Sequence, residues 1–410
     1  MLNKNGEREL AYVVKIDNIE PITGSDNCEA AVVGGWRIMT RKGTFKAGDL
    51  AIYFEIDSKV PETEVFSFLA GKHYKVKTQK YTFGGKGNFI SQGLLMHAND
   101  FGWELTDNKL IKREKDTIGE GYFLTKELGV TYADPLDNGR KAKSDPNAKY
   151  KAMAGRHPKL FRNPIIKAIY KTAFGKKLLF IFFGKKSDKK RQWPEWVAKT
   201  DEERIQNLAH MIPEFVKEKW IATEKVDGTS TTFTMRRKGK KFEYYVCSRN
   251  VVMNQPGKDK TCYYAETAGN VYTEMSDKYN MENVLRSMFI DEMIAITVQG
   301  ETYGNAIQKR DYSISGHDLV VFNVIFHYKD GTTVRLNPYE GAEEMAKYGV
   351  PYVPIIGKID LPDSCDKILE LAGGKSEIDG LPREGIVFRT TDGKRSFKAV
   401  DNNFILKYHN

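Results

Sequence analysis

Four short strings in the second half of the chain constrain its fold and chemistry most. They are TEKVDG at 223–228, GETYG at 300–304, EGIVFR at 384–389 and SFK at 396–398. A single Lys-x-Asp-Gly string should arise by chance in roughly one chain in ten of this length, given average composition. All four strings in this order, over about 180 residues, are much harder to assign to chance. We therefore interpret them as parts of one site.

The lysine of the first string has the properties of a nucleophile. Lys225 stands between β-like residues and the Gly228 turn, so we expect it at a strand end, facing a pocket. An amine attacks phosphorus only when unprotonated, and an exposed lysine near neutral pH is almost always protonated. A bound metal ion and Lys398 are expected to lower the pKa of Lys225 and to stabilise a departing pyrophosphate. An isolated string of this kind would more often be a surface lysine before a tight turn.

Three carboxylates and two further side chains complete the candidate site. Asp227, Glu301 and Glu384 supply hard oxygen ligands for Mg²⁺ or Mn²⁺, directly or through water. Arg249 carries a planar fork suited to a ribose, a phosphate or an RNA 3′ end. Phe322 lies in a β-like run and can stack on adenine, although a phenylalanine in such a run usually belongs to a core.

The pattern along the chain predicts an α+β protein with three parts. Residues 8–105 hold about five short β-like runs separated by Gly-rich turns, which favours a small closed barrel such as an OB-fold. We predict an N-terminal OB-type β-barrel over 1–134, a basic linker or helical insert over 135–193, and an α+β catalytic domain of antiparallel sheets and helices over 194–410. Thr200 and Glu203 form a capping-box pattern, which predicts a helix starting at residue 200.

The charge of the chain is concentrated in one segment. Residues 140–191 contain 17 Lys or Arg and only two acids, while the whole chain carries a formal net charge of +10. Such a segment favours contact with a polyanion such as RNA. The alternative is a solvated linker whose lysines only keep it soluble. Residues 164–183 within it have an amphipathic pattern that predicts one or two helices.

Several classes of protein are excluded by composition. No apolar run approaches the ~20 residues that a membrane span needs, and the first residues lack the apolar stretch of a secretory signal. The four cysteines show no CxxC spacing, so neither a zinc site nor a disulfide framework is indicated. We expect an intracellular monomer that does not associate with membranes.

The series of strings resembles the nucleotidyl-transferase motifs of the covalent ligase superfamily, which also includes DNA ligases and mRNA capping enzymes. Within it the chain resembles the ATP-dependent RNA ligases with an N-terminal OB domain, the Naegleria and Deinococcus type. Further strings carry this narrower resemblance: FKAGD at 45–49, YFEID at 53–57, ISQGLL at 90–95 and KTDEERIQN at 199–207.

The resemblance implies a role for each site residue. Lys225 would become linked to AMP, and Asp227, Glu301 and Glu384 would organise the metal. The remaining implied contacts are Glu224 with the adenine edge, Phe322 over adenine, Arg249 with the ribose or the RNA end, and Lys398 with the α-phosphate. Relatives often have Lys-x-Lys in the last motif, whereas Ser396 and Val400 flank Lys398 here. Lys394 and Lys407 are the candidates for the missing second lysine.

The implied activity is ATP-dependent joining of RNA 3′-hydroxyl and 5′-phosphate ends, with ATP and Mg²⁺ or Mn²⁺ as cofactors and RNA as partner. Three alternatives remain open: a ligase for DNA or RNA/DNA nicks, a capping enzyme, and a non-catalytic OB-type RNA-binding protein with a degenerate transferase domain. Only twelve residues follow Lys398, too few for the OB domain that capping enzymes and classical DNA ligases carry there.

Overall fold

The structure is a computed structural model, and its chain divides into two compact units, residues 1–133 with 193–410 and residues 134–192. The described residues are 1–3, 7–85, 87–106, 109–113, 116–133, 160, 163–172, 175–176, 178–179, 193–249, 251–253 and 270–409. Most of the basic segment, 140–191, therefore lies outside the described residues. Within it, α2 (Pro164–Lys171) is a helix, as the amphipathic pattern predicts.

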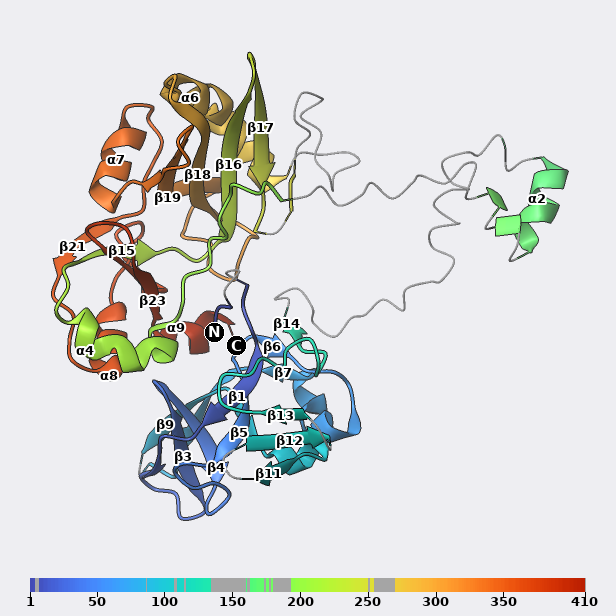
Figure 1. Cartoon of the computed structure of the whole chain (residues 1–410), viewed down its shortest axis with the longest axis vertical. Coiled ribbons are helices and arrows are strands. Elements are labelled where there is room, and N and C mark those ends of the chain that lie inside the picture. Colours follow the sequence, from blue (N-terminus) through green and yellow to red (C-terminus); the bar gives the residue numbers. More distant parts are fainter. Residues whose placement is uncertain are drawn as a thin grey trace. The chain divides into compact units, whose positions relative to one another are not determined.

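The first 133 residues form small antiparallel sheets (Figure 1). Every residue of β5 is buried, because this strand lies between β1 and β10 and has side chains in both adjoining hydrophobic clusters. Two short 3-10 helices, η1 (Glu64–Lys72) and η2 (Ala98–Phe101), complete this part. The strands are β1 (Ala11–Lys15), β2 (Asn18–Pro21), β3 (Cys28–Val33), β4 (Trp36–Arg41), β5 (Leu50–Phe54), β6 (Ser58–Lys59), β7 (Lys75–Val76), β8 (Thr78–Thr82), β9 (Asn88–Gln92), β10 (Leu94–Met96), β11 (Glu104–Thr106), β12 (Lys109–Arg113), β13 (Asp116–Ile118) and β14 (Thr131–Tyr132).

The second half of the chain contains two larger antiparallel sheets with helices, which confirms the predicted α+β class. The first has the order β21-β15-β22-β23, and the second has the order β17-β16-β18-β19-β20. Their strands are β15 (Trp220–Lys225), β16 (Thr229–Lys238), β17 (Lys241–Cys247), β18 (Met293–Gly304), β19 (His317–Tyr328), β20 (Thr333–Arg335), β21 (Ile355–Ile359), β22 (Gly385–Thr390) and β23 (Ser396–Val400).

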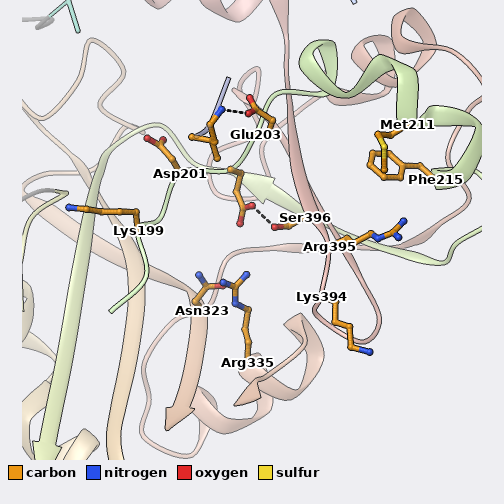
Figure 2. Close-up of a pocket in the computed structure, with 12 residues that line it drawn as sticks. Lys199, Asp201, Glu203, Met211, Phe215, Asn323, Arg335, Lys394, Arg395 and Ser396 are labelled. Atoms are coloured by element: carbon orange, nitrogen blue, oxygen red, sulfur yellow. Dashed lines mark hydrogen bonds between the residues drawn. The ribbon is translucent and has the colours of Figure 1, made fainter. Parts of the chain in front are cut away.

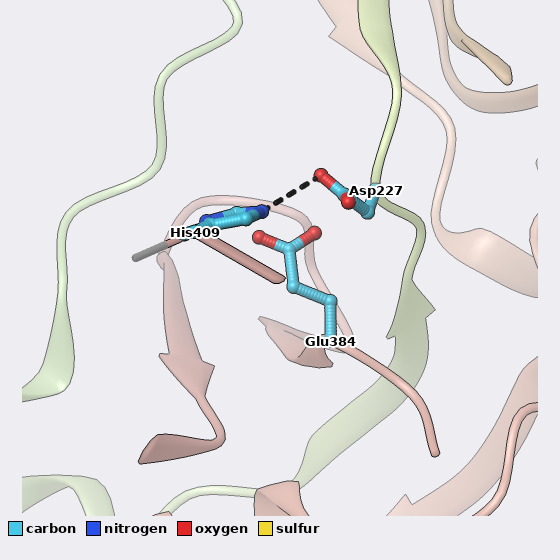
Figure 3. A group of neighbouring side chains, drawn as sticks. All are labelled: Asp227, Glu384 and His409. Atoms are coloured by element: carbon cyan, nitrogen blue, oxygen red, sulfur yellow. Dashed lines mark hydrogen bonds and ion pairs between the residues drawn. The ribbon is translucent and has the colours of Figure 1, made fainter. Parts of the chain in front are cut away.

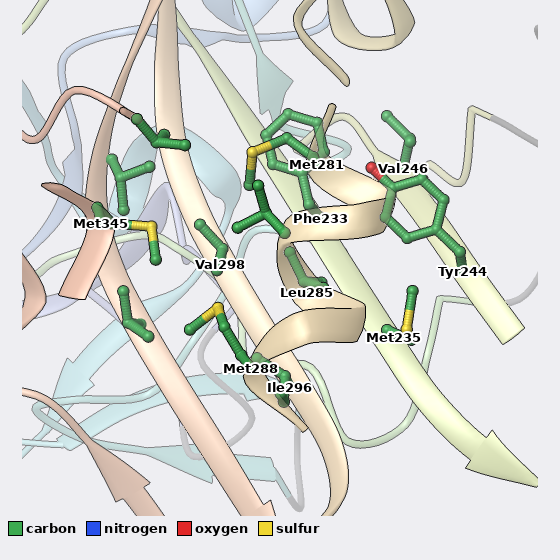
Figure 4. Close-up of a cluster of buried hydrophobic side chains, with 14 of the residues drawn as sticks. Phe233, Met235, Tyr244, Val246, Met281, Leu285, Met288, Ile296, Val298 and Met345 are labelled. Atoms are coloured by element: carbon green, nitrogen blue, oxygen red, sulfur yellow. The ribbon is translucent and has the colours of Figure 1, made fainter. Parts of the chain in front are cut away.

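Helices cover these sheets through apolar faces. On the five-stranded sheet, Leu285 of α6 packs with Phe233 and Val298 in one buried cluster (Figure 4). On the four-stranded sheet, Phe388 and Phe397 stack at 4.9 Å beside helices η4, α4 and α8. The helical segments are η4 (Ile205–Met211), α4 (Ile212–Phe215), α5 (Val271–Lys278), α6 (Met281–Met288), α7 (Pro338–Ala346), α8 (Cys365–Ala372), α9 (Asn402–Phe404) and the π-helical η5 (Ile405–His409).

The predicted helix start at Thr200 is wrong. Residues 201–203 are in no helix or strand, Arg204 has an extended backbone, and the helical segment η4 begins at Ile205. The chain there pairs with β23 instead: Lys398 N–H donates to Glu203 O at 2.8 Å. The Thr200 hydroxyl bonds to the Ser230 hydroxyl at 2.8 Å rather than capping a helix. The acids of this segment therefore meet partners on strands instead of lying in a first helical turn.

Candidate active site

Lys225 is the last residue of β15, at the strand end that the sequence predicts. In the register of β15 with β22 it lies opposite Gly385, directly beside Glu384. Its Nζ donates to Glu384 Oε2 at 2.7 Å. A side chain on Gly385 would collide with the backbone of β23, because its Cβ would lie 2.2 Å from Ala399 O. Glycine at this position therefore lets the strands close tightly beside the lysine.

The charge around Lys225 differs from the expected arrangement. Burial lowers the pKa of Lys225, but the carboxylates of Glu384 and Glu301 outweigh burial, so this pKa lies above its ordinary value. We expected cations to lower it. The charges of the chain itself act in the opposite direction, since Lys225 faces carboxylates more closely than it faces Lys398. Lys225 is thus held protonated in an ion pair with Glu384.

The carboxylates converge on a group that includes one residue missed by the sequence analysis. Asp227, Glu384 and His409 each offer a ligand atom, and these atoms lie within 4.8 Å of one another (Figure 3). His409 Nε2 lies 3.2 Å from Asp227 Oδ1. Asp227 is fixed from its other side, because its backbone N–H donates to the Tyr312 hydroxyl at 2.6 Å.

This group suits a divalent cation. Asp227 Oδ2 is buried, and no hydrogen-bond partner for it occurs in the described part of the chain. A buried carboxylate oxygen without a partner is costly unless a ligand satisfies it. Two carboxylates and an imidazole are a donor set that Mn²⁺ accepts, and the carboxylates also suit Mg²⁺.

Glu301 joins the site from the other sheet. A β-bulge between Gln299 and Gly300 precedes it in the pairing of β18 with β19. Burial, together with the charges of Glu384 and Asp227, raises the pKa of Glu301 to about 8, although Lys225 lowers it. The three acids therefore influence one another, as expected for residues that share a cation site. Gly228 allows the approach, since a Cβ there would lie 2.3 Å from Thr302 O.

An apolar cluster beside Lys225 contains the predicted stacking residue. Phe322 is partly buried and packs with Val226 and Tyr303. Glu224 lies near the same cluster, where its Oε2 accepts from the backbone N–H of Glu377 at 2.9 Å. Burial raises the pKa of Glu224, and its Oε1 is buried with no partner among the described residues. An aromatic ring and an unsatisfied carboxylate oxygen are what a purine base with an exocyclic amine would meet.

The second lysine lies in a separate cluster of charges. Lys398 Nζ is 3.7 Å from Asp201 Oδ1, and Asp201 also forms an ion pair with Arg249. Burial lowers the pKa of Lys398 to about 7, although Asp201 raises it. Asp201 was missed as a site residue because the sequence pattern placed it in a helix. Its membership in the 199–207 string was the available signal.

The missing second lysine of the last motif has no obvious replacement. Ser396 stands where the Lys-x-Lys pattern would have its first lysine. Its hydroxyl donates to the Glu202 carboxylate, so the side chain at this position is neutral. Lys394 pairs with Asp392 at 3.3 Å and is 81% exposed. Lys407 is exposed beside the Tyr408 ring. Neither lysine occurs in the charge environment of Lys225 or Lys398.

The first half of the chain contacts the second half at Glu55. This fully buried carboxylate accepts from Arg8 Nε at 2.9 Å, from the Tyr12 hydroxyl at 2.9 Å and from Asn207 Nδ2 at 3.0 Å. Asn207 belongs to the 199–207 string, so two of the family-specific strings are in direct contact. Arg8 in turn contributes to the electrostatic environment of Asp201 and Lys398.

Comparison with known proteins agrees with this arrangement. The RNA ligase family profile matches residues 218–409, and a family described as an OB-fold domain matches residues 10–97. No curated protein matches the chain. No helix among the described residues is long and apolar enough to cross a membrane.

Solved structures of Naegleria gruberi RNA ligase resemble the chain over 98% of its length. A lysine-to-alanine mutant in the apo form has 25% identity and a TM-score of 0.69, with 99% of that chain covered. The protein with PPi has 26% identity and a TM-score of 0.68, with 99% covered. A glutamate-to-alanine mutant with ATP and Mn has 25% identity and a TM-score of 0.68, with 100% covered. Residues 10–97 thus match an OB-fold domain, residues 218–409 match the RNA ligase family, and the whole chain resembles Naegleria gruberi RNA ligase in its fold.

Proposed function

We propose that the chain joins RNA 3′-hydroxyl and 5′-phosphate ends with ATP, through an AMP attached to Lys225. The observation that carries this proposal is the position of Lys225 Nζ, at a strand end 2.7 Å from Glu384 Oε2 and beside the apolar cluster that includes Phe322, with Glu224 nearby. The Naegleria gruberi relative has been solved with ATP and Mn and with AMP and Mn, which supports the same ligands here.

In the first step Lys225 acts as the nucleophile. Its Nζ gives up a proton and attacks the α-phosphorus of ATP, so that an N–P bond forms and the bond to the β-phosphate breaks. Phe322 would stack on the adenine and Glu224 Oε1 would accept from its amine. Lys398, with Arg249, would hold negative charge on the transferring phosphate.

The carboxylate group would hold Mg²⁺ or Mn²⁺. Asp227 and Glu384 are the expected ligands, with Glu301 through water and His409 as a further candidate. When bound, the ion neutralises the carboxylates that keep Lys225 protonated and adds positive charge beside the phosphate. Such an ion would satisfy Asp227 Oδ2, which has no hydrogen-bond partner among the described residues.

The remaining steps transfer AMP to RNA and release it. An oxygen of the RNA 5′-phosphate attacks the AMP phosphorus, the N–P bond to Lys225 breaks, and Lys225 recovers its proton. The RNA 3′-hydroxyl then attacks the activated 5′-phosphate, so that AMP leaves and a phosphodiester forms. Arg249 would contact the RNA end; its side chain is 38% exposed and paired with Asp201, which supports this role.

The test combines labelling with sealing. Labelled ATP with Mg²⁺ or Mn²⁺ should transfer AMP to the protein, and all-RNA nicked duplexes should be sealed faster than all-DNA duplexes. Mixed RNA/DNA nicks then show on which side of the junction ribose is required. Labelling by GTP instead would favour the capping alternative, and equal sealing of DNA would favour a general polynucleotide ligase. Absence of any labelling would favour a binding protein.

A further inference from the structure

A second pocket lies apart from the carboxylates around Lys225. It has a volume of about 470 Å³ and is lined by the 199–203 segment, by η4 and α4, by β19 and β20, and by the hairpin between β22 and β23 (Figure 2). It is connected to Lys398 through Asp201, which pairs with the Lys398 side chain. Asn323 lines this pocket, whereas its neighbour Phe322 packs in the apolar cluster, since adjacent strand residues face opposite sides.

The acids that line the pocket are neutralised by their own partners. Glu202 pairs with Arg389 at 3.1 Å and accepts from Ser396. Asp201 is shared between Arg249 and Lys398. The pocket is therefore not an acidic surface, despite the carboxylates in its wall.

Arg335 lines the pocket, and the acid that acts on its charge, Glu202, is already paired with Arg389. No hydrogen bond or ion pair of its guanidinium occurs among the residues that the structure describes, and burial together with Arg389 lowers the pKa of Arg335. An arginine in this environment favours an anion that brings its own negative charge. Arg395, also in the wall, is already paired with Glu218 at 2.7 Å.

Asn323 has a buried side-chain oxygen that accepts no hydrogen bond from the described residues. Its side chain is 3% exposed, its Nδ2 donates to Gln299 Oε1 at 2.9 Å, and its Oδ1 is buried without a partner in the described part of the chain. An orphaned amide oxygen needs a hydroxyl or amine donor from a ligand. The Asn323 and Arg335 side chains point to the same region in Figure 2.

The pocket also has an apolar side, formed by Met211 and Phe215. An anion site, an acceptor for a hydroxyl and an apolar wall together match a nucleotide of RNA, with its phosphate, its 2′-hydroxyl and its base. The pyrophosphate portion of ATP offers only the first of these three features. A volume of about 470 Å³ also exceeds what two phosphates occupy.

We propose that this pocket binds one nucleotide of the RNA substrate next to the reacting end, with a backbone phosphate on Arg335 and a ribose 2′-hydroxyl donating to Asn323 Oδ1. The inference rests on the proposed function, because it assigns a subsite for the RNA that Lys225 activates. Asp201 and Lys398 connect the subsite to the phosphate that reacts.

The experiment compares Arg335→Ala with Arg286→Ala, a control that removes one arginine from an exposed ion pair on α6. RNA binding is measured by fluorescence anisotropy over a salt series, and sealing is measured on RNA that already carries the 5′ adenylate. Arg335→Ala should weaken RNA binding about tenfold and reduce the salt slope by about one phosphate contact. Labelling by ATP should stay within about twofold of wild type, because the subsite does not contact the triphosphate.

A second measurement requires no protein variant. Single 2′-deoxy substitutions are placed in turn at each nucleotide near the junction, and one position should lose about tenfold in binding. Arg335→Gln provides a variant closer in size if the alanine variant does not fold. If Arg335→Ala slows ATP labelling as much as sealing, the pocket serves the triphosphate and the inference is wrong.

Unchanged RNA affinity and salt slope in a folded Arg335 variant would also overturn it, as would indifference to every 2′-deoxy substitution. These outcomes differ from failure of the proposed function, which would appear as absent labelling of the wild-type protein itself.

Discussion

At the scale of residues, the distinctive feature is the separation of two lysines into opposite electrostatic environments. Lys225 lies among carboxylates that raise its pKa, whereas Lys398 is buried near other cations and has a pKa of about 7. The string pattern identified both lysines and the three carboxylates near Lys225. It could not predict His409 or Asp201, because their contacts join residues far apart in sequence: Asp227 and His409 are separated by 182 positions.

Asp201→Asn tests the environment of Lys398. Asp201 raises the pKa of Lys398, so its removal should lower this pKa further and leave the side chain neutral at a lower pH. The alkaline limb of the single-turnover labelling rate should then move to lower pH. Asp392→Asn, which removes an acid paired with exposed Lys394, serves as the control and should leave the limb in place. An unshifted limb in Asp201→Asn would show that charge on Lys398 does not govern the rate.

At the scale of elements, the segment 199–204 departs most from the sequence prediction. Its capping-box pattern predicted a helix, but local preference lost to pairing with β23 and to ion pairs of Glu202 and Asp201 with Arg389 and Lys398. The strand at Lys225 and the turn at Gly228 were predictable because β-like runs and glycine have local signatures. The tertiary partners of a short polar segment have no such local signature in the sequence.

Glu55→Gln tests the contact between the OB-fold domain and η4. Burial opposes ionisation of Glu55, but Arg8 and other partners, including Asn207, hold the pKa of Glu55 at about 2. This value lies below the ordinary 4.5, so ionised Glu55 stabilises the fold above about pH 4.5 and the contribution is lost as pH falls towards 2. The variant leaves Arg8 buried without its carboxylate and should lower the free energy of unfolding at neutral pH by about 3 kcal/mol.

Urea unfolding at several pH values measures this effect. The wild-type protein should lose stability between pH 4.5 and the lowest accessible pH more steeply than Glu55→Gln. Glu20→Gln, at the partly exposed ion pair with Arg37, should cost less than about 1 kcal/mol. Equal losses for the two variants would mean that Glu55 contributes no more than a surface acid.

At the scale of the whole molecule, the main feature is the order of the domains along the chain. The OB-fold domain precedes the ligase domain, as the sequence indicates and as the family matches confirm. The domain boundaries at 134 and 193 remain predictions, and so does the role of the basic segment 140–191. The sequence shows the positive charge of this segment, but charge alone does not identify a binding partner.

Replacing residues 140–191 tests that segment. A Gly/Ser linker of equal length removes its 17 basic residues while preserving the spacing. If these residues contact RNA, the affinity should fall and the salt dependence of binding should flatten, because fewer counterions are released. ATP labelling should be unaffected. Unchanged RNA binding would show that the segment does not contact RNA and acts only as a spacer.

The central claim is that Lys225 carries AMP. The protein is incubated with ATP and Mg²⁺ or Mn²⁺, digested, and mapped by mass spectrometry, with Lys225→Arg as the matched control that retains charge. We predict AMP on the peptide containing Lys225 and none anywhere in the control. AMP on a different residue, or undiminished labelling of Lys225→Arg, would contradict the account.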